Sequence, residues 1–333
     1  MKKLIVSGLV VSLLSVTATS ICAQQLDSLP GKPAHSFRGL SVVNNRQFWV
    51  SGNKGTVGRS TDGGKTIQWM QVKGYETRDF RDIEAFDAVT AVVMAIDSPG
   101  LILRTHDGGA SWQEVYRDNS SGVFIDAIAF YKNKAGIGIG DPMDGKFYLV
   151  QSQDAGQSWQ RLQPTMSAPD SGEACFASSG TNIVQLKKGK FAFATGGRSS
   201  RLWNGETLLP LALMQGGTST GANSLAVCGR RWIVVGGDFS RDTVTQEHIL
   251  VSNDRGQTWQ APIQPTSGYR SCITAINKRK WIACGTSGVD ISNDGGKTWR
   301  NISKTGYHVV QVAKRGRAVY LAGGNGRLAK LRW

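Results

Sequence analysis

The 333-residue sequence has little of what defines several common functional classes. It contains only five cysteines and four histidines, and the histidines are widely separated. This cysteine count is low for a disulfide-stabilised scaffold, and no group of residues has the spacing of a metal site. No stretch shows the 3.6-residue periodicity of an amphipathic helix. The sequence therefore predicts neither a metal centre nor a helical protein.

Apolar runs of membrane-spanning length are also missing. The longest run, residues 4–16, is too short to cross a bilayer. It follows Lys2 and Lys3 and precedes small and polar residues up to Ala23, an arrangement typical of a secretory signal peptide. We predict that residues 1–23 are a signal peptide and that residues 24–333 are exported to the periplasm or the extracellular space.

Glycine, by contrast, is abundant, and several of the 41 glycines belong to a repeated segment of the form S/T-x-D-x-G-x-T/S-W. Complete copies occupy residues 105–112, 152–159, 252–259 and 292–299, and residues 60–66 form a copy without the tryptophan. The aspartate can accept backbone hydrogen bonds, the glycine can adopt a positive φ, and the tryptophan can pack over the turn. We call these segments boxed turns. Their characteristic residues are Asp62, Asp107, Trp112, Asp154, Trp159, Asp254, Trp259, Asp294 and Trp299.

The spacing of the boxed turns defines a repeat. Their aspartates are 45, 47, 100 and 40 residues apart, so the longest interval contains one unit without a box. Alternating strands and glycine-rich turns fill every unit. The units begin at Phe37, Phe80, Phe124, Gly172, Gly221, Tyr269 and Tyr307. The seventh is one strand short, and residues 24–29 can supply that strand. The sequence predicts an all-β, monomeric, seven-bladed β-propeller of four-stranded antiparallel blades, formed as a single domain by residues 24–333.

The boxed turns resemble the Asp-box, or bacterial neuraminidase repeat, of sialidases, sortilin-like domains and photosystem II stability/assembly factor-like proteins. Residues 35–333 are similar to the assembly factor-like proteins, and the segments SFRGLSVV and DFRDIEAFD resemble those of uncharacterised secreted bacterial members. The resemblance implies a propeller whose boxes lie between the two outer strands of each blade. It also implies a binding or assembly role, since plant and cyanobacterial members bind a membrane-protein assembly partner with the help of an arginine-rich face.

The predicted topology separates the boxed turns from the candidate binding residues. A four-stranded meander changes ends at every turn, so the inner-strand starts and the second-to-third loops lie opposite the boxes. Arg38, Arg81 and Arg270 occupy equivalent places in blades one, two and six, and we predict that they form one arc for an anionic ligand. The other candidate ligand-binding residues on this face are Asp82, Asp126, Asp141, Asp144, Glu173, Arg198, Arg201, Asn223 and His308.

Two alternatives stay open for this face. Asp82, Asp126 and Glu173 could neutralise the arginines, or the arginines could clamp a substrate carboxylate as they do in sialidases. Against an enzyme, no tyrosine can be placed beside a glutamate here, and the Arg-Ile-Pro signature of sialidases is absent. We expect a non-catalytic binding or assembly module without a cofactor or metal. A sialidase-like or other glycan-acting hydrolase is the alternative.

The charge of the chain is compatible with an anionic partner. Basic residues outnumber acidic ones by 15, or by 13 without Lys2 and Lys3. They are scattered rather than gathered in a stripe, and export argues against nucleic acid. The expected partners are a protein with an acidic segment, a carboxylated sugar or an anionic lipid.

Four cysteines follow the predicted signal peptide, namely Cys175, Cys228, Cys272 and Cys284. Cys272 and Cys284 flank a predicted turn at residues 277–280, so that counting from the turn sets them opposite each other. They are expected to form either a cross-strand disulfide or two buried thiols.

Overall fold

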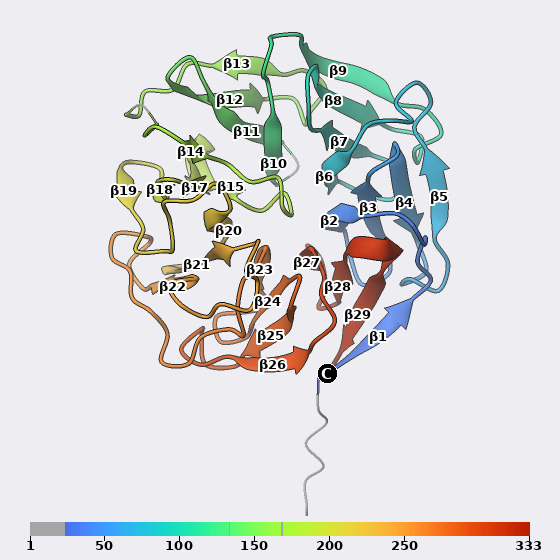
Figure 1. The fold of residues 1–333 in the computed structure, drawn as a ribbon. Coiled ribbons are helices and arrows are strands. Elements are labelled where there is room, and N and C mark those ends of the chain that lie inside the picture. The colour runs from blue at the N-terminus through green and yellow to red at the C-terminus, as the bar shows by residue number, and fades with distance from the viewer. Residues whose placement is uncertain (1–23, 133, 168) are drawn as a thin grey trace, which may run out of the picture.

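Seven β-sheets stand around a common axis, as Figure 1 shows in a view down that axis. The computed structural model describes residues 24–132, 134–167 and 169–333, and the predicted signal peptide lies outside this part of the chain. Within the described residues, no helix is long and apolar enough to cross a membrane. The prediction of a seven-bladed, all-β propeller with four-stranded antiparallel blades is confirmed.

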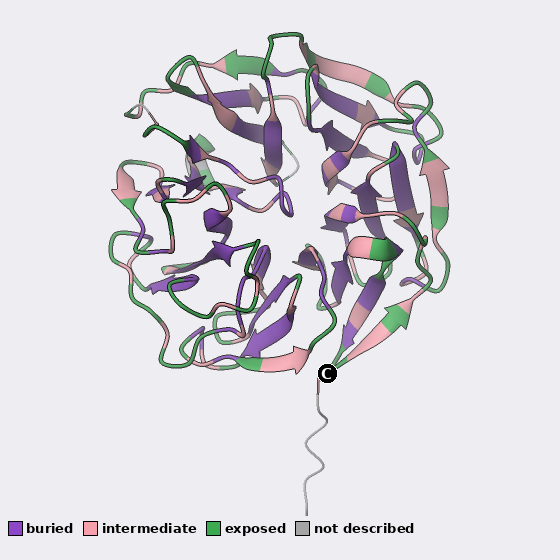
Figure 2. Ribbon diagram, in the orientation of Figure 1, coloured by how far each residue is buried: buried purple, intermediate pink, exposed green. Residues whose placement is uncertain are grey.

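The first three blades are antiparallel meanders whose strands follow chain order from the axis outwards. Blade 1 contains β2 (Phe37–Val42), β3 (Phe48–Gly52), β4 (Thr56–Ser60) and β5 (Gln68–Gln71). Blade 2 contains β6 (Phe80–Ala85), β7 (Ala91–Ala95), β8 (Gly100–Thr105) and β9 (Gln113–Asp118). Blade 3 contains β10 (Ile125–Tyr131), β11 (Ala135–Met143), β12 (Lys146–Ser152) and β13 (Gln160–Leu162). The inner and middle strands are mostly buried and the outermost strands are partly exposed (Figure 2). Strands such as β7 are apolar throughout because both of their faces pack against other blades.

Blades 4 to 6 are less regular. Blade 4 contains β15 (Ile183–Gln185), β16 (Phe191–Ala194), β18 (Arg201–Trp203) and β19 (Leu208–Pro210), with the short 3₁₀ helix η1 (Lys187–Gly189) between its first two strands. Blade 5 contains β20 (Thr220–Cys228), β21 (Arg231–Asp238) and β22 (Ile249–Ser252), and Gln260 bridges to Val251 in the fourth position. Blade 6 contains β23 (Cys272–Ala275), β24 (Trp281–Gly285), β25 (Gly288–Ser292) and β26 (Arg300–Ser303).

The inner strand of blade 4 does not begin near Gly172, and this part of the sequence prediction was wrong. The segment after Gly172 forms β14 (Glu173–Ala174), which pairs with β17 (Gly196–Gly197), and β17 in turn pairs with β20 of blade 5. The inner strand is β15, about ten residues later in the chain. Two short strands thus link blades 4 and 5 at the end of the sheet where the inner strands start.

Blade 7 closes the ring with strands from both ends of the described chain. It contains β27 (Val309–Val312), β28 (Val319–Ala322) and β29 (Leu328–Arg332), and the 3₁₀ helix η2 (Gly324–Gly326) precedes β29. Its fourth strand is β1 (Gln25–Leu29), which pairs antiparallel with β29 from Gln25 opposite Arg332 to Leu29 opposite Leu328. The two strands lie side by side in Figure 1. The predicted closure is confirmed.

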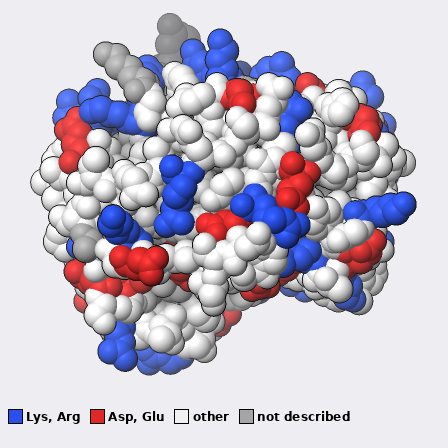
Figure 3. Space-filling model, turned by 90° about the horizontal axis from the view of Figure 1, so that it is seen from above, with Lys and Arg blue, Asp and Glu red and all other residues white. Residues whose placement is uncertain are grey.

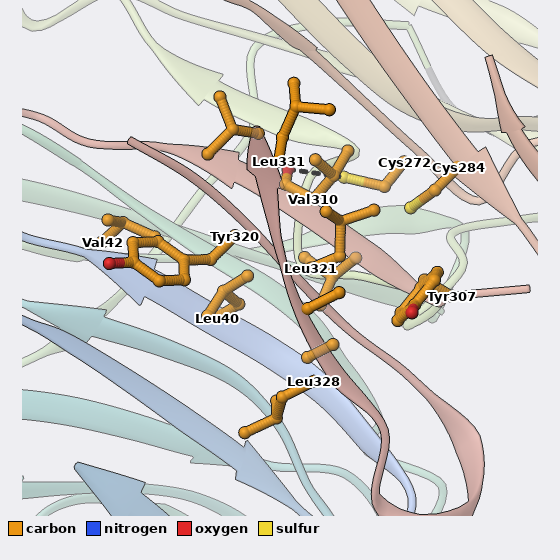
Figure 4. Packing of buried hydrophobic residues seen from close by; sticks show 14 of the residues in the cluster. Leu40, Val42, Cys272, Cys284, Tyr307, Val310, Tyr320, Leu321, Leu328 and Leu331 are labelled. Carbon is orange, nitrogen blue, oxygen red and sulfur yellow. Dashed lines mark hydrogen bonds between the residues drawn. The ribbon is translucent and has the colours of Figure 1, made fainter. Parts of the chain in front are cut away.

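The largest apolar cluster fills the space between blades 1, 6 and 7 (Figure 4). Leu40 and Val42 come from blade 1, Leu321 and Leu328 from blade 7. Burial of such side chains is the main stabilising term of the fold. Blade 6 contributes Cys272 and Cys284, which are register partners as predicted, and both are free thiols in the structure. The Cys272 thiol donates to the backbone carbonyl of Val310 at 3.4 Å.

The boxed turns follow the third strand of their blades and share one hydrogen-bond pattern. In the last copy, Asp294 Oδ1 accepts the N–H groups of Lys297 and Thr298 at 3.0 Å, and Oδ2 accepts the Thr298 hydroxyl at 2.6 Å. Gly296 adopts φ +88°, and a Cβ there would clash with Ile233 of blade 5. Trp299 Nε1 donates to the Gly296 carbonyl at 3.1 Å. Each boxed turn is thus a tight hairpin, and this one also fastens blade 6 to its neighbour.

Replacement of Asp294 by alanine is expected to destabilise the protein by about 1–3 kcal/mol, because turn N–H groups lose their acceptor. Partial burial opposes ionisation, but hydrogen bonds from Thr298 and Ser292 outweigh it and lower the pKa of Asp294 below the usual 3.8. The carboxylate therefore stabilises the fold above pH 3.8 and loses this effect as the pH falls through its lowered pKa.

Urea unfolding at pH 7 and at successively lower pH measures this difference. The midpoints of wild type and Asp294→Ala should converge in acid. The same variant should bind ligands normally, because the boxed turn lies opposite the candidate binding face. A binding defect at unchanged stability would show that the two faces are assigned wrongly.

Candidate functional site

A pocket of about 510 Å³ opens where the inner strands start, on the face opposite the boxed turns. We call it the mouth pocket. Six blades and the segment that runs from β14 to β15 contribute to its lining, which includes, in chain order, Arg38, Arg81, Asp126, Phe176, Phe239, Tyr269 and His308. Basic side chains come from blades 1 and 2, and aromatic side chains come mainly from the segment after β14 and from blades 5 and 6.

Local backbone irregularities place the polar residues of the inner strands. The register shifts at Arg38 in β2, at Arg81 in β6, at Asp126 in β10 and at Asn223 in β20. A β-bulge of this kind bends the strand and re-aims the side chain of the extra residue. The same position in four blades therefore carries a polar side chain that departs from the ordinary alternation of the sheet.

Arg38 and Arg81 form the basic side of the mouth pocket. The Arg38 guanidinium is half-buried, and its Nη1 donates to the backbone carbonyl of Ser178 at 3.2 Å. Among the described residues no carboxylate lies within 4.0 Å of it. Burial and then the nearby Arg81 lower the pKa of Arg38. Arg81 Nε pairs with Asp79 at 2.8 Å. The Arg38 guanidinium nevertheless remains cationic at neutral pH.

Apart from Asp79, the titratable groups around these arginines do little to compensate their positive charge. Burial lowers the pKa of His308 to about 3, with help from Arg38, so this imidazole is neutral at pH 7. Asp126 is completely buried, and neither carboxylate oxygen has a hydrogen-bond partner among the described residues. Burial and then Asp141 raise the pKa of Asp126 well above its usual value. Burial also raises the pKa of Asp141, whose Oδ1 accepts the Cys175 N–H at 2.9 Å.

Three aromatic rings form the other side of the pocket. The centroid of the Phe239 ring lies 5.7 Å from that of Phe176, and the two ring planes are 89° apart. The centroid of Tyr269 lies 6.3 Å from that of Phe239, with 71° between the planes. Burial raises the pKa of Tyr269 to about 12, and its hydroxyl donates to Asn223 Oδ1 at 3.0 Å. The two phenylalanines were not among the sequence-predicted site residues. The signal that could have pointed to Phe239 is an aromatic residue at the start of the polar loop between β21 and β22, on the candidate binding face.

The structure brings together five of the predicted ligand-binding residues, namely Arg38, Arg81, Asp126, Asp141 and His308. The others lie outside the pocket lining: Asp82, Asp144, Glu173, Arg198, Arg201, Asn223 and Arg270. Asp82 accepts the N–H groups of Ile83 and Ile128 at 2.8 Å and so joins blades 2 and 3. Glu173 pairs with Arg201, while Asp144 and Arg198 are exposed elsewhere.

Arg270 does not join Arg38 and Arg81, and the predicted three-arginine arc was wrong. Its side chain is fully buried and forms an ion pair with Asp290 of β25. It also donates to the Tyr269 carbonyl at 2.6 Å and to the Ser287 hydroxyl at 3.0 Å. Asn223 holds two residues of the pocket lining in place, since its Oδ1 accepts the Ser178 hydroxyl at 2.6 Å as well as the Tyr269 hydroxyl.

Within the described ranges, no group of three or more His, Cys, Asp or Glu side chains is arranged to hold a metal ion. The tyrosine of the mouth pocket, Tyr269, is hydrogen-bonded to an amide and not to a carboxylate. The side chains gathered here are suited to bind an anionic group beside an apolar one.

The fold and this pocket define a seven-bladed propeller with a mixed basic and aromatic mouth. No protein-family model matches the sequence, and no curated protein matches it. Among solved structures, "YCF48 bound to D1 peptide" is similar, with 17% identity, a TM-score of 0.66 and coverage of 95% of this chain and 99% of the other. YCF48 from Cyanidioschyzon merolae has 16% identity, a TM-score of 0.63 and coverage of 93% and 99%. The Pan2 WD40 domain of Neurospora crassa has 11% identity, a TM-score of 0.61 and coverage of 90% and 89%. At these sequence identities, the similarities show a shared fold and nothing more.

Proposed function

We propose that this protein is an exported, non-catalytic binding or assembly module that holds an acidic segment of a protein partner at the mouth pocket. One observation carries the proposal. Arg38 and Arg81 line the same pocket, and the carboxyl groups around them do not neutralise their combined charge. Guanidinium groups are weakly hydrated and match carboxylates in bidentate geometry, so they favour such a ligand.

The similar structures support a protein ligand. One of them is a propeller of the same architecture that is bound to a peptide. The mouth pocket also has the volume of a site for a few residues rather than for a folded domain. On the side of the molecule that Figure 3 shows, basic and acidic side chains are interspersed. The attraction for an acidic segment is assigned to the pocket, where Arg38 and Arg81 lie together.

Replacement of Arg38 or Arg81 by alanine is expected to weaken binding of an acidic peptide by about 10- to 100-fold, because a hydrogen bond between charged groups contributes about 1.5–3 kcal/mol. Fluorescence anisotropy with labelled Asp- and Glu-containing peptides, at low and moderate salt, measures the affinity. The salt dependence should also become weaker in both variants.

The matched control is Arg46→Ala, which removes one exposed arginine on the face of the boxed turns. It should bind as the wild type does. If the Arg38 and Arg81 variants bind the peptides with wild-type affinity, the proposed site is wrong. Turnover of a sialoside by the wild type would instead favour the glycan-acting hydrolase.

A further inference from the structure

The mouth pocket contains an exposed aromatic side chain. In the described part of the chain, the exposed large apolar side chains are Val89, Phe239 and Ile263. Of these three, only Phe239 lines the mouth pocket, and its side chain is 45% exposed. An exposed aromatic residue that lies in a pocket rather than on an open surface marks a contact site for a ligand.

The loop that carries Phe239 is held in place by hydrogen bonds on both sides of the ring. Asp238 accepts the Ser219 hydroxyl at 2.7 Å, the Ser240 N–H at 3.0 Å and Arg241 Nε at 2.7 Å. The Phe239 N–H donates to the Ser219 carbonyl at 3.1 Å. Further along the loop, the Asp242 carboxylate accepts the Thr286 hydroxyl of blade 6 at 2.6 Å. The backbone that carries the ring is therefore held in place before any ligand binds, which lowers the entropic cost of binding.

The aromatic side of the pocket is continuous with the basic side. Phe239 contacts Phe176 edge-on, and Ser178, two residues after Phe176, accepts a hydrogen bond from Arg38. Asn223 Oδ1 accepts hydrogen bonds from both Ser178 and Tyr269 and so connects these two residues. A ligand that places an anionic group on Arg38 therefore has its neighbouring atoms next to the three rings.

We infer that the mouth pocket recognises a short partner segment in which an aromatic side chain stands next to a carboxylate. This inference rests on the proposed function and adds the second recognition element. The carboxylate binds Arg38 and Arg81, and the aromatic ring packs edge-to-face among Phe176, Phe239 and Tyr269. Perpendicular arrangements such as the one between Phe176 and Phe239 are the preferred geometry of aromatic pairs and can be extended by a third ring.

Four peptides of equal length test the inference, with Asp-Phe, Asp-Ala, Asn-Phe or Asn-Ala at the centre of an otherwise neutral sequence. The wild type should bind the Asp-Phe peptide tightest, and loss of either group should cost about tenfold. In Phe239→Ala, replacement of the peptide Phe by Ala should change the affinity less than twofold. Phe239→Tyr should restore the preference, since it restores the ring. Melting curves verify that both variants are folded.

Ile263→Ala is the control for loss of an exposed apolar side chain. Ile263 is 84% exposed and its N–H donates to the Lys297 carbonyl in a boxed turn, away from the mouth pocket. This variant should discriminate among the peptides as the wild type does. Equal binding of the Asp-Phe and Asp-Ala peptides by the wild type would overturn the inference and leave the proposed function standing. Equal binding of the Asp-Phe and Asn-Phe peptides would overturn the proposed function as well.

Discussion

Deletion of residues 24–34 is expected to remove much of the stability of the propeller. β1 supplies the fourth strand of blade 7 and pairs with β29 over five register positions. Leu26 and Leu29 pack against the largest apolar cluster. Both are partly buried; full burial of one such side chain would contribute about 1.5–3 kcal/mol, whereas whole domains are stable by about 5–15 kcal/mol. Loss of the strand also leaves β29 as an open edge, which promotes association between molecules.

The connection after β1 adds to this effect. The Lys32 N–H donates to the Gly326 carbonyl at 3.1 Å, and the Gly326 N–H donates to the His35 carbonyl at 2.6 Å. These bonds hold the segment between β1 and β2 against η2. The ring of blades is therefore closed by the pairing of β1 with β29 and also by hydrogen bonds between residues 32–35 and η2.

Urea unfolding and size-exclusion chromatography compare a chain that begins at Gln24 with one that begins at His35. The shorter chain should unfold at much lower urea concentration and form larger species. A synthetic peptide of residues 24–34, added in excess, should restore part of the lost stability, because it binds the folded state alone. Equal unfolding midpoints for the two chains would contradict the role assigned to β1.

The number of blades and the closure could be predicted because both depend on spacing. The boxed turns recur at nearly constant intervals, and a blade that lacks a strand requires one from elsewhere in the chain. Blade 4 has no box, so nothing in its sequence marked the start of its inner strand. Analogy with the other units predicts a start at Gly172, whereas the pairing of β14 with β17 and of β17 with β20 joins residues from different repeats. A repeat pattern contains no information about such contacts.

The candidate site was predictable in part for the same reason. Topology predicted that Arg38 and Arg81 lie on the face opposite the boxed turns, and the structure brings them into one pocket. The position of Arg270 in the repeat could not show that its partner is Asp290. One sequence signal was available, however. Two residues before the serine or threonine of each box stand Gly58, Leu103, Val150, Leu250 and Asp290. A carboxylate in a buried strand where the other units have apolar residues or glycine requires a partner.

The buried pair of Arg270 and Asp290 leads to the second large effect. Both side chains are fully buried, and Arg270 Nε donates to Asp290 Oδ2 at 2.6 Å. Asp290 Oδ1 also accepts the Ser267 hydroxyl at 3.0 Å. Removal of one member leaves an uncompensated charge in the interior, which costs about 3–5 kcal/mol. Arg270→Ala and Asp290→Ala should each lower the free energy of unfolding by this amount.

A double replacement tests whether the loss of stability in the single variants comes from the unpaired buried charge. Arg270→Met combined with Asp290→Leu removes both charges and fills the space with apolar atoms, so it should recover most of the stability lost in either single variant. Arg241→Ala is the exposed control. Its partner Asp238 is buried, but the Arg241 side chain is 65% exposed, so its loss should cost no more than about 1 kcal/mol. Urea unfolding at pH 7 provides all four values.

Peptide binding by the double variant then decides between a structural and a ligand-binding role for Arg270. A buried, paired guanidinium cannot contact a ligand in the mouth pocket, so the double variant should bind the acidic peptides with wild-type affinity. The Arg38→Ala variant, measured under the same conditions, should bind them weakly at nearly unchanged stability. If the double variant is stable and folded but has lost acidic-peptide binding, Arg270 belongs to the binding site and its pairing with Asp290 is broken when the ligand enters.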